Sequence, residues 1–87
     1  INRRYKMTAI VNIGLKKGVL DSQGKATHHT LDTLGFQEMV ADVRVGKQIT
    51  LQLNTNDENE AKEQVAKMCE DLLANTVIED YEIIIEA

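Results

Sequence analysis

Apolar and polar residues alternate near the start of the chain, from Tyr5 to Leu15. A period of two places every second side chain on the same side of an extended backbone, which is typical of a strand with one buried face. We therefore predict a long half-buried strand here, and we expect the Lys16-Lys17-Gly18 run to end it.

A first helix is predicted from Asp21 or Ser22 to about Leu34. Both Asp and Ser are favourable N-cap residues, because their side chains accept hydrogen bonds from the free N–H groups of the first turn. Gly35 stands where a glycine commonly closes a helix. The apolar stripe of this helix is thin and consists of Ala26, Thr27, Leu31 and Leu34.

The middle of the chain predicts a hairpin. Phe36–Val40 should re-enter the sheet, and Val43 and Val45 should form a short strand. Gly46 followed by lysine is a credible turn, because glycine adopts a positive φ without steric cost. Gln48–Leu53 alternates again and should form the second strand of the hairpin.

A second amphipathic helix is predicted from its N-cap, Asp57, to about Ala74. Asn75 should end it, because Asn tolerates the left-handed conformation that closes many helices. After a corner at Thr76–Asp80, the pattern returns to a period of two from Tyr81, which predicts the last strand.

The predicted order is β-α-β-β-α-β in a single domain over residues 1–87, with residues 1–4 as a flexible leader. The simplest packing is an α+β fold of the ferredoxin-like class, a two-layer sandwich with an antiparallel four-stranded sheet and two helices on one face. Its usual strand order makes the first and last strands neighbours. Ile10 and Ile84 would then lie side by side on the uncovered face, and we name them as candidates for a homo-oligomer interface.

Composition limits the classes of partner. The net charge of −4 and the isoelectric point near 5.0 argue against nucleic acid or an anionic membrane, since both select for an excess of Lys and Arg. No apolar run approaches the roughly 20 residues that span a bilayer. A single cysteine fits a reducing cytoplasm.

A chain of 87 residues with 3% aromatic residues buries a modest core, so we expect a homo-oligomer, a dimer or a tetramer.

The residues do not form a recognisable catalytic or metal-binding pattern. Cys69 lies on the apolar side of the second predicted helix, where a cysteine usually acts as a small hydrophobic residue. His28 and His29 point about 100° apart on a helix and cannot chelate one ion together. The Asp21–Lys25 segment lacks the spacing of a phosphate-binding loop and is better interpreted as a contact loop. We predict no catalytic residue and no metal site.

Three segments resemble the PurS family, the small subunits of multi-subunit phosphoribosylformylglycinamidine synthase. They are VLDSQGKA (Val19–Ala26), DVRVGK (Asp42–Lys47) and MCEDLLANTVIEDYEI (Met68–Ile83). The resemblance extends from about Tyr5 to Glu86, and Ser22 stands where the family commonly has proline.

The resemblance implies a role in purine biosynthesis, in a complex that converts formylglycinamide ribonucleotide to the amidine with ATP, Mg and glutamine. A large synthetase subunit would carry the ATP-dependent ligation and a glutaminase subunit would release ammonia. This chain would bind no cofactor of its own. It would bridge the two other subunits as a ferredoxin-like homo-oligomer and assist ammonia transfer.

The family motifs indicate which residues contact the partner subunits. For Arg44 and Lys47 we favour partner contact over a structural role, because the fold itself gives their exposed charges no evident function. The full set of candidates is Asp21, Gln23, Gly24, Lys25, Arg44, Gly46, Lys47, Asn75, Thr76, Ile78, Glu79, Asp80 and Tyr81.

Two alternatives come from other classes. The first is a ligand-sensing module of the ACT kind, which would bind an amino acid at a dimer interface beside the corner between strand one and helix one. The second is a small acylphosphatase-like enzyme, which would need an arginine directly after strand one; Lys16-Lys17-Gly18-Val19 offers none.

Overall fold

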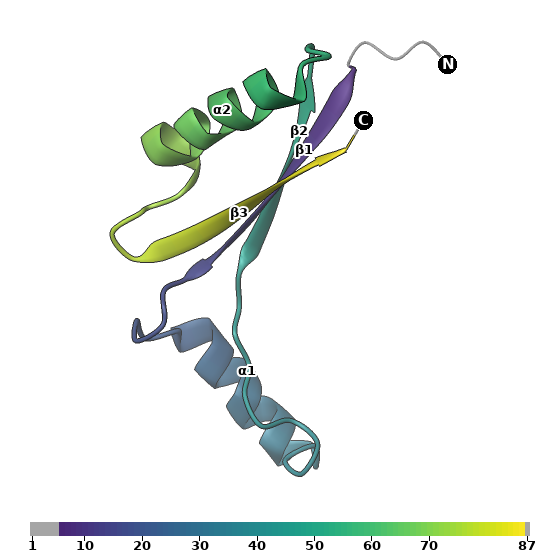
Figure 1. Cartoon of the computed structure of the whole chain (residues 1–87). Helices are drawn as coiled ribbons and strands as arrows, with labels where there is room; N and C mark the ends of the chain where they lie inside the picture. The colour runs from purple at the N-terminus through teal and green to yellow at the C-terminus, as the bar shows by residue number, and fades with distance from the viewer. Residues whose placement is uncertain (1–5, 87) are drawn as a thin grey trace.

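Strand β1 (Met7–Leu15) lies at the centre of the sheet in the computed structural model, which describes residues 6–86 (Figure 1). It pairs antiparallel with β2 (Lys47–Leu53) on one edge and with β3 (Glu79–Glu86) on the other. The helices are α1 (Ser22–Thr33) and α2 (Glu58–Met68), the latter continued by a short π-helix, η1 (Cys69–Leu73). The predicted leader, residues 1–4, lies outside the described residues.

The core forms between one face of β1 and the buried face of α2. Ala9 and Val11 on β1 and Val65 on α2 are fully buried, and Cys69 extends the same face. The flanking strands add half-buried residues on the same side of the sheet. The alternation predicted for the first strand is thus confirmed, because one face of β1 is buried and the other remains partly open.

Helix α2 begins where the sequence predicts and ends differently. The Asp57 carboxylate accepts hydrogen bonds from the N–H groups of Asn59 and Glu60, at 2.9 and 3.2 Å. At the other end the helix widens, and the Ala74 N–H donates to the Cys69 carbonyl at 3.0 Å, five residues back. The left-handed conformation predicted for Asn75 is wrong, since no non-glycine residue between 6 and 86 has a positive φ.

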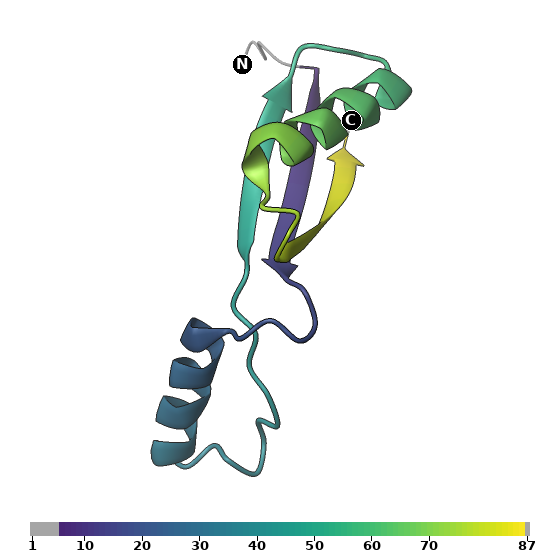
Figure 2. The ribbon, with the colours of Figure 1, turned by 90° about the vertical axis from the view of Figure 1, so that its left-hand side faces the viewer.

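Helix α1 does not cover the sheet. Figures 1 and 2 show it beyond the end of β1, as an arm joined to the sheet by two crossings of the chain. Its N-cap Asp21 and the closing Gly35, with φ of +96°, agree with the prediction. Gly24 is its only buried residue, because the helix extends past the end of the sheet (Figure 1).

The four-stranded sheet with two helices on one face is therefore wrong for the single chain. Residues 6–86 form a three-stranded sheet in the order β2-β1-β3, with α2 alone over one face. Val43 and Val45 are half-buried in extended backbone that pairs with no strand among these residues. The reason is geometric: this segment is the return crossing from the arm, and it reaches the sheet only at Gly46.

The single chain is elongated and leaves apolar side chains uncovered. Its radius of gyration is 16.9 Å, whereas a compact domain of this length has about 12 Å. On the arm, the exposed fractions of Leu34 and Met39 are 66% and 84%, and Phe36 is exposed beside them. Among residues 6–86, no helix is long and apolar enough to cross a membrane.

The core predicts a clear difference between two valines. Val65→Ala removes two buried methyl groups and should lower the free energy of unfolding by about 2 kcal/mol. Val77→Ala makes the same chemical change at an exposed site and should change it by less than about 0.5 kcal/mol. Urea unfolding monitored by circular dichroism measures both; equal losses would contradict this description of the core.

Candidate functional site

The two groups of predicted contact residues meet at one end of the sheet. We call the two chain crossings to α1, residues 16–21 and 42–46, the neck, and residues 74–80 the corner. The last residue of β1, Leu15, pairs with Glu79 at the start of β3, and the Lys16 N–H donates to the Ile78 carbonyl at 2.8 Å. The neck and the corner are therefore adjacent, although they are far apart in sequence.

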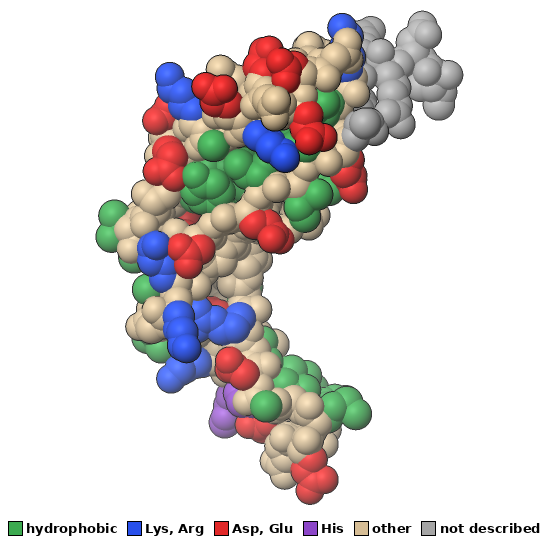
Figure 3. All heavy atoms as spheres, in the orientation of Figure 1, with side chains coloured by type: hydrophobic (Ala, Val, Ile, Leu, Met, Phe, Trp, Pro, Cys, Tyr) green, Lys and Arg blue, Asp and Glu red, His purple; other side chains and the backbone are tan. Residues whose placement is uncertain are grey.

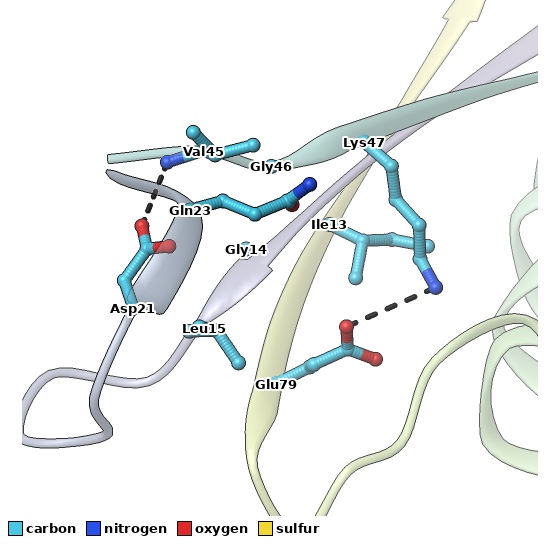
Figure 4. Close-up of a pocket in the computed structure, with 9 residues that line it drawn as sticks. All are labelled: Ile13, Gly14, Leu15, Asp21, Gln23, Val45, Gly46, Lys47 and Glu79. Carbon is cyan, nitrogen blue, oxygen red and sulfur yellow. Dashed lines mark hydrogen bonds and ion pairs between the residues drawn. The ribbon is translucent and has the colours of Figure 1, made fainter. Parts of the chain in front are cut away.

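Asp21 ties the two crossings of the neck together. Its Oδ1 accepts the Gly24 N–H at 2.8 Å, which caps α1, and its Oδ2 accepts the Val45 N–H of the return crossing at 2.8 Å (Figure 4). The residue is 5% exposed. The hydrogen bonds from Val45 and Gly24, with a smaller contribution from the charge of Arg44, lower the pKa of this carboxyl below its ordinary value.

Two glycines let the backbones of the neck approach closely. A Cβ on Gly24 would lie 2.5 Å from the Val43 carbonyl oxygen, and one on Gly46 would lie 2.6 Å from the Ile13 carbonyl oxygen. Gly46 is thus required by close packing and not by a positive φ. The hairpin turn predicted at this position is wrong, because the segment before Gly46 forms no strand with β2.

Arg44 and Lys47 both have a role within the fold, contrary to the expectation from sequence. The Arg44 Nη2 donates to the carbonyls of Leu15 and Lys16, at 3.1 and 3.4 Å, and so braces the start of the neck. The Lys47 Nζ lies 3.8 Å from the Glu79 Oε2 and joins β2 to β3 across the end of β1. Both side chains remain exposed enough to contact a partner as well.

A small pocket of about 220 Å³ lies between the end of the sheet and the start of α1. Figure 4 shows the Gln23 amide and the Lys47–Glu79 pair around it. It is smaller than the roughly 300 Å³ at which ligand sites usually begin. Five of the predicted contact residues line it: Asp21, Gln23, Gly46, Lys47 and Glu79. Lys25 and Arg44 line a second hollow on the neck instead.

The polar residues of the corner are mostly engaged with the chain itself. The Glu79 Oε1 accepts the Asn75 N–H at 2.7 Å, and the Asn75 Oδ1 accepts the Val77 N–H at 3.2 Å. The Tyr81 hydroxyl donates to the Glu70 carboxylate at 2.7 Å, which raises the pKa of Tyr81 to about 12. Thr76 and Ile78 are exposed.

Lys16 is a member of this site that the sequence prediction missed. Its Nζ lies 2.9 Å from the exposed Asp80 carboxylate, so the pair joins the neck to β3. On the face shown in Figure 3, Lys and Arg side chains gather over the neck, whereas Asp and Glu side chains surround α2. A lysine after a strand is usually solvated, and no sequence pattern marks one that forms an ion pair. The sequence therefore could not have indicated the Lys16–Asp80 pair.

Ile10 and Ile84 lie where the sequence predicts. They are paired across β1 and β3 on the face away from α2, and Ile84 is exposed. A row of hydrogen-bonded side chains borders them, in which Gln48 donates to Asn12 at 2.8 Å and Asn12 donates to Glu82 at 3.1 Å.

Titratable groups elsewhere show no catalytic arrangement within the described part of the chain. Cys69 is fully buried, and desolvation raises the pKa of its thiol, so it behaves as a core residue. His28 lies beside the Val40 carbonyl at 3.2 Å and Asp32 at 3.7 Å on α1. Residues 6–86 hold no cluster of three or more His, Cys, Asp or Glu residues suited to a metal ion.

Comparison with known proteins decides the family. The family model described as "PurS: Phosphoribosylformylglycinamidine (FGAM) synthase" matches residues 8–87. The chain belongs to the PurS family. Subunit PurS of Methanocaldococcus jannaschii is 44% identical over 82 residues, covering 94% of this chain and 95% of the relative. Subunit PurS of Bacillus subtilis is 46% identical over 76 residues, covering 87% and 88%.

Solved structures of PurS have the same shape. The crystal structure of M. jannaschii PurS superposes with a TM-score of 0.85 at 43% identity, and the match covers 93% of this chain and 96% of that one. A chain in the structure of PurLQS from Thermotoga maritima matches with a TM-score of 0.80 at 30% identity, covering 91% and 96%. The fold of this chain, including the arm, therefore resembles that of these solved PurS chains.

The geometry of the neck predicts that Asp21 contributes more to stability than an ordinary helix cap. Asp21→Ala should destabilise the protein more than Asp57→Ala, because Asp57 caps one helix whereas Asp21 caps a helix and also holds the return crossing. Urea unfolding of the two variants at pH 7 measures the difference, and an equal loss would contradict the double role.

The sign of the pH dependence follows from the lowered pKa. The stability that ionised Asp21 contributes is fully present above its unfolded pKa, near 3.8, and is lost as the pH falls through the lower folded pKa. The stability difference between the wild type and Asp21→Asn should therefore be constant from pH 5 to 7 and should shrink below pH 4.

Proposed function

We propose that this chain is the non-catalytic bridging subunit of its phosphoribosylformylglycinamidine synthase, holding the large synthetase and the glutaminase subunits together in purine biosynthesis. The observation that carries the proposal is the match to the PurS family, which covers almost the whole chain and includes the arm. The relative in the PurLQS structure supports assembly with larger subunits. ATP, Mg and glutamine would be used by those larger subunits. The cytoplasmic location of this chain stays a prediction.

The use of polar residues in the neck and the corner supports a scaffold. Asp21, Arg44, Asn75 and Glu79 all bind the chain's own backbone, so they fix a shape and are not left free for chemistry. A subunit that positions two enzymes needs such a rigid surface. By bringing the glutaminase near the synthetase, it would assist the transfer of ammonia between them.

Self-association would complete the fold that the single chain leaves open. Among residues 6–86 the outer edge of β2 has no partner strand, and Ile49, Leu51 and Leu53 beside it are only half-buried. The arm offers what is missing, since extended backbone around Val43 and Val45 accompanies α1. We infer that the arm of a second copy supplies the fourth strand and the second helix, so the ferredoxin-like sandwich forms between copies.

The predicted partner contacts then divide into two roles. Asp21 and Gly24 are buried and shape the neck, whereas Gln23, Lys25 and Lys47 are exposed at its surface and can reach another subunit. Ile10 and Ile84 remain candidates for a further contact between copies, of the kind that would convert a dimer into a tetramer. Membership of the PurS family replaces the ligand-sensing and phosphatase alternatives.

Reconstitution tests the bridging role. Added to the large synthetase and glutaminase subunits of its own organism, the chain should restore glutamine-dependent formation of the amidine and leave ammonia-dependent formation by the large subunit nearly unchanged. The chain alone should hydrolyse neither glutamine nor ATP. Unchanged glutamine-dependent activity on addition of the chain would refute the proposal.

The arm interface predicts a change of oligomeric state. Leu34→Asp combined with Met39→Asp places two charges on the exposed apolar surface of the arm and should convert the homo-oligomer to monomers. Ile84→Asp is the matched variant on the open face of the sheet and should leave a dimer. Light scattering coupled to gel filtration measures the masses; dissociation by Ile84→Asp alone would place the primary interface on the sheet.

A further inference from the structure

The corner carries large apolar side chains that the fold does not use. Leu72, near the end of η1, and Val77, at the tip of the corner, each have 82% of their surface exposed. Met68 and Ile78 on either side of them are exposed as well. Single exposed apolar residues are ordinary, but a group of them on one short segment marks a contact surface.

The exposure of Val77 is imposed by the backbone and does not reflect a loose loop. The residue lies between two fixed points, since its own N–H binds the Asn75 Oδ1 at 3.2 Å and the Glu79 N–H binds the Asn75 carbonyl at 2.7 Å. The Glu79 carboxylate closes the same turn on the Asn75 N–H at 2.7 Å. A rigid apolar side chain loses little conformational entropy on binding, which favours it as an anchor.

We propose that Leu72 and Val77 form an apolar knob that enters a socket on another subunit of the synthase complex, an apolar socket with Lys and Arg at its rim. The inference rests on the proposed function and extends it to a defined surface. The basic rim follows from charge complementarity, because the exposed Glu70 and Asp71 directly precede Leu72.

A second copy of this chain joined through the β2 edge would not occupy this surface. The sheet order β2-β1-β3 places the corner, which leads into β3, at the edge opposite to β2. The proposed homo-oligomer forms through the β2 edge and the arm, and the β2 edge lies on the other side of the sheet. A homo-oligomer formed through the arm would therefore leave the knob free for a different protein.

The knob also changes which corner residues are expected to carry binding energy. Asn75, Glu79 and Tyr81 already have partners within the chain, so a subunit that contacts them would have to compete for those hydrogen bonds. Leu72 and Val77 have no such competition. An apolar centre surrounded by a polar rim is the usual arrangement of a protein–protein interface.

The test uses charge substitutions in the full chain with purified large synthetase and glutaminase subunits. Val77→Asp and Leu72→Asp should each weaken binding to the complex roughly tenfold or more and lower glutamine-dependent activity at limiting concentrations of the chain. Gln64→Asp adds the same charge to an exposed position of α2 and should bind within about twofold of the wild type. Val77→Ile should retain binding, because it keeps the apolar side chain.

Each outcome bears on a separate claim. Circular dichroism and light scattering on every variant should show an unchanged fold and oligomeric mass. Wild-type-like binding by Val77→Asp and Leu72→Asp overturns the knob while the bridging role stands. A change of oligomeric mass in these variants assigns the corner to self-association and also overturns it. Failure of the wild-type chain to bind either subunit overturns the proposed function, and the knob with it.

Discussion

Two N–H groups share the carboxylate of Asp21. The N–H of Gly24, in the first turn of α1, donates to Oδ1, and the N–H of Val45, on the return crossing of the neck, donates to Oδ2. This arrangement holds the beginning of α1 against the return crossing, and the glycine at position 24 allows the two backbones to come close. The direction of the arm follows from it. Since α1 starts beyond the end of β1, folding the helix back over the sheet would pull Asp21 away from the Val45 N–H of the return crossing.

The position of the arm determines how the protein becomes stable. A single helix covers a three-stranded sheet, and the residues along the outer edge of β2 stay half-buried. A small domain with so little core has a narrow margin of stability, and the proposed association with a second copy would extend the buried surface. The same elongation spreads the surface over 48 Å in its longest direction, which suits the proposed bridging role.

At the end of the sheet the polar residues are bonded within the chain, whereas large apolar residues face solvent; in an enzyme site the polar residues usually face the substrate. The carboxylates, amides and guanidinium of the neck and corner are bound to the chain and define its shape. The large apolar side chains of Leu72 and Val77 are exposed to solvent. In the proposed role, a surface built in this way would recognise another protein by its fit and by the exclusion of water.

The amino-acid sequence by itself determined the local elements. Three local signals predicted the structure correctly: the period of two in β1, the Asp caps at positions 21 and 57, and the glycine at position 35. Each signal depends on residues within a few positions of each other. The tertiary structure alone decided the rest. Val43 and Val45 alternate with polar residues as in a strand, yet whether they pair depends on where α1 places this segment. That position is set by the Asp21–Val45 hydrogen bond and by close backbone contacts of Gly24 and Gly46, all with residues far away in the sequence. Likewise, Arg44 has carbonyl partners twenty-eight and twenty-nine residues away, which no local pattern could reveal.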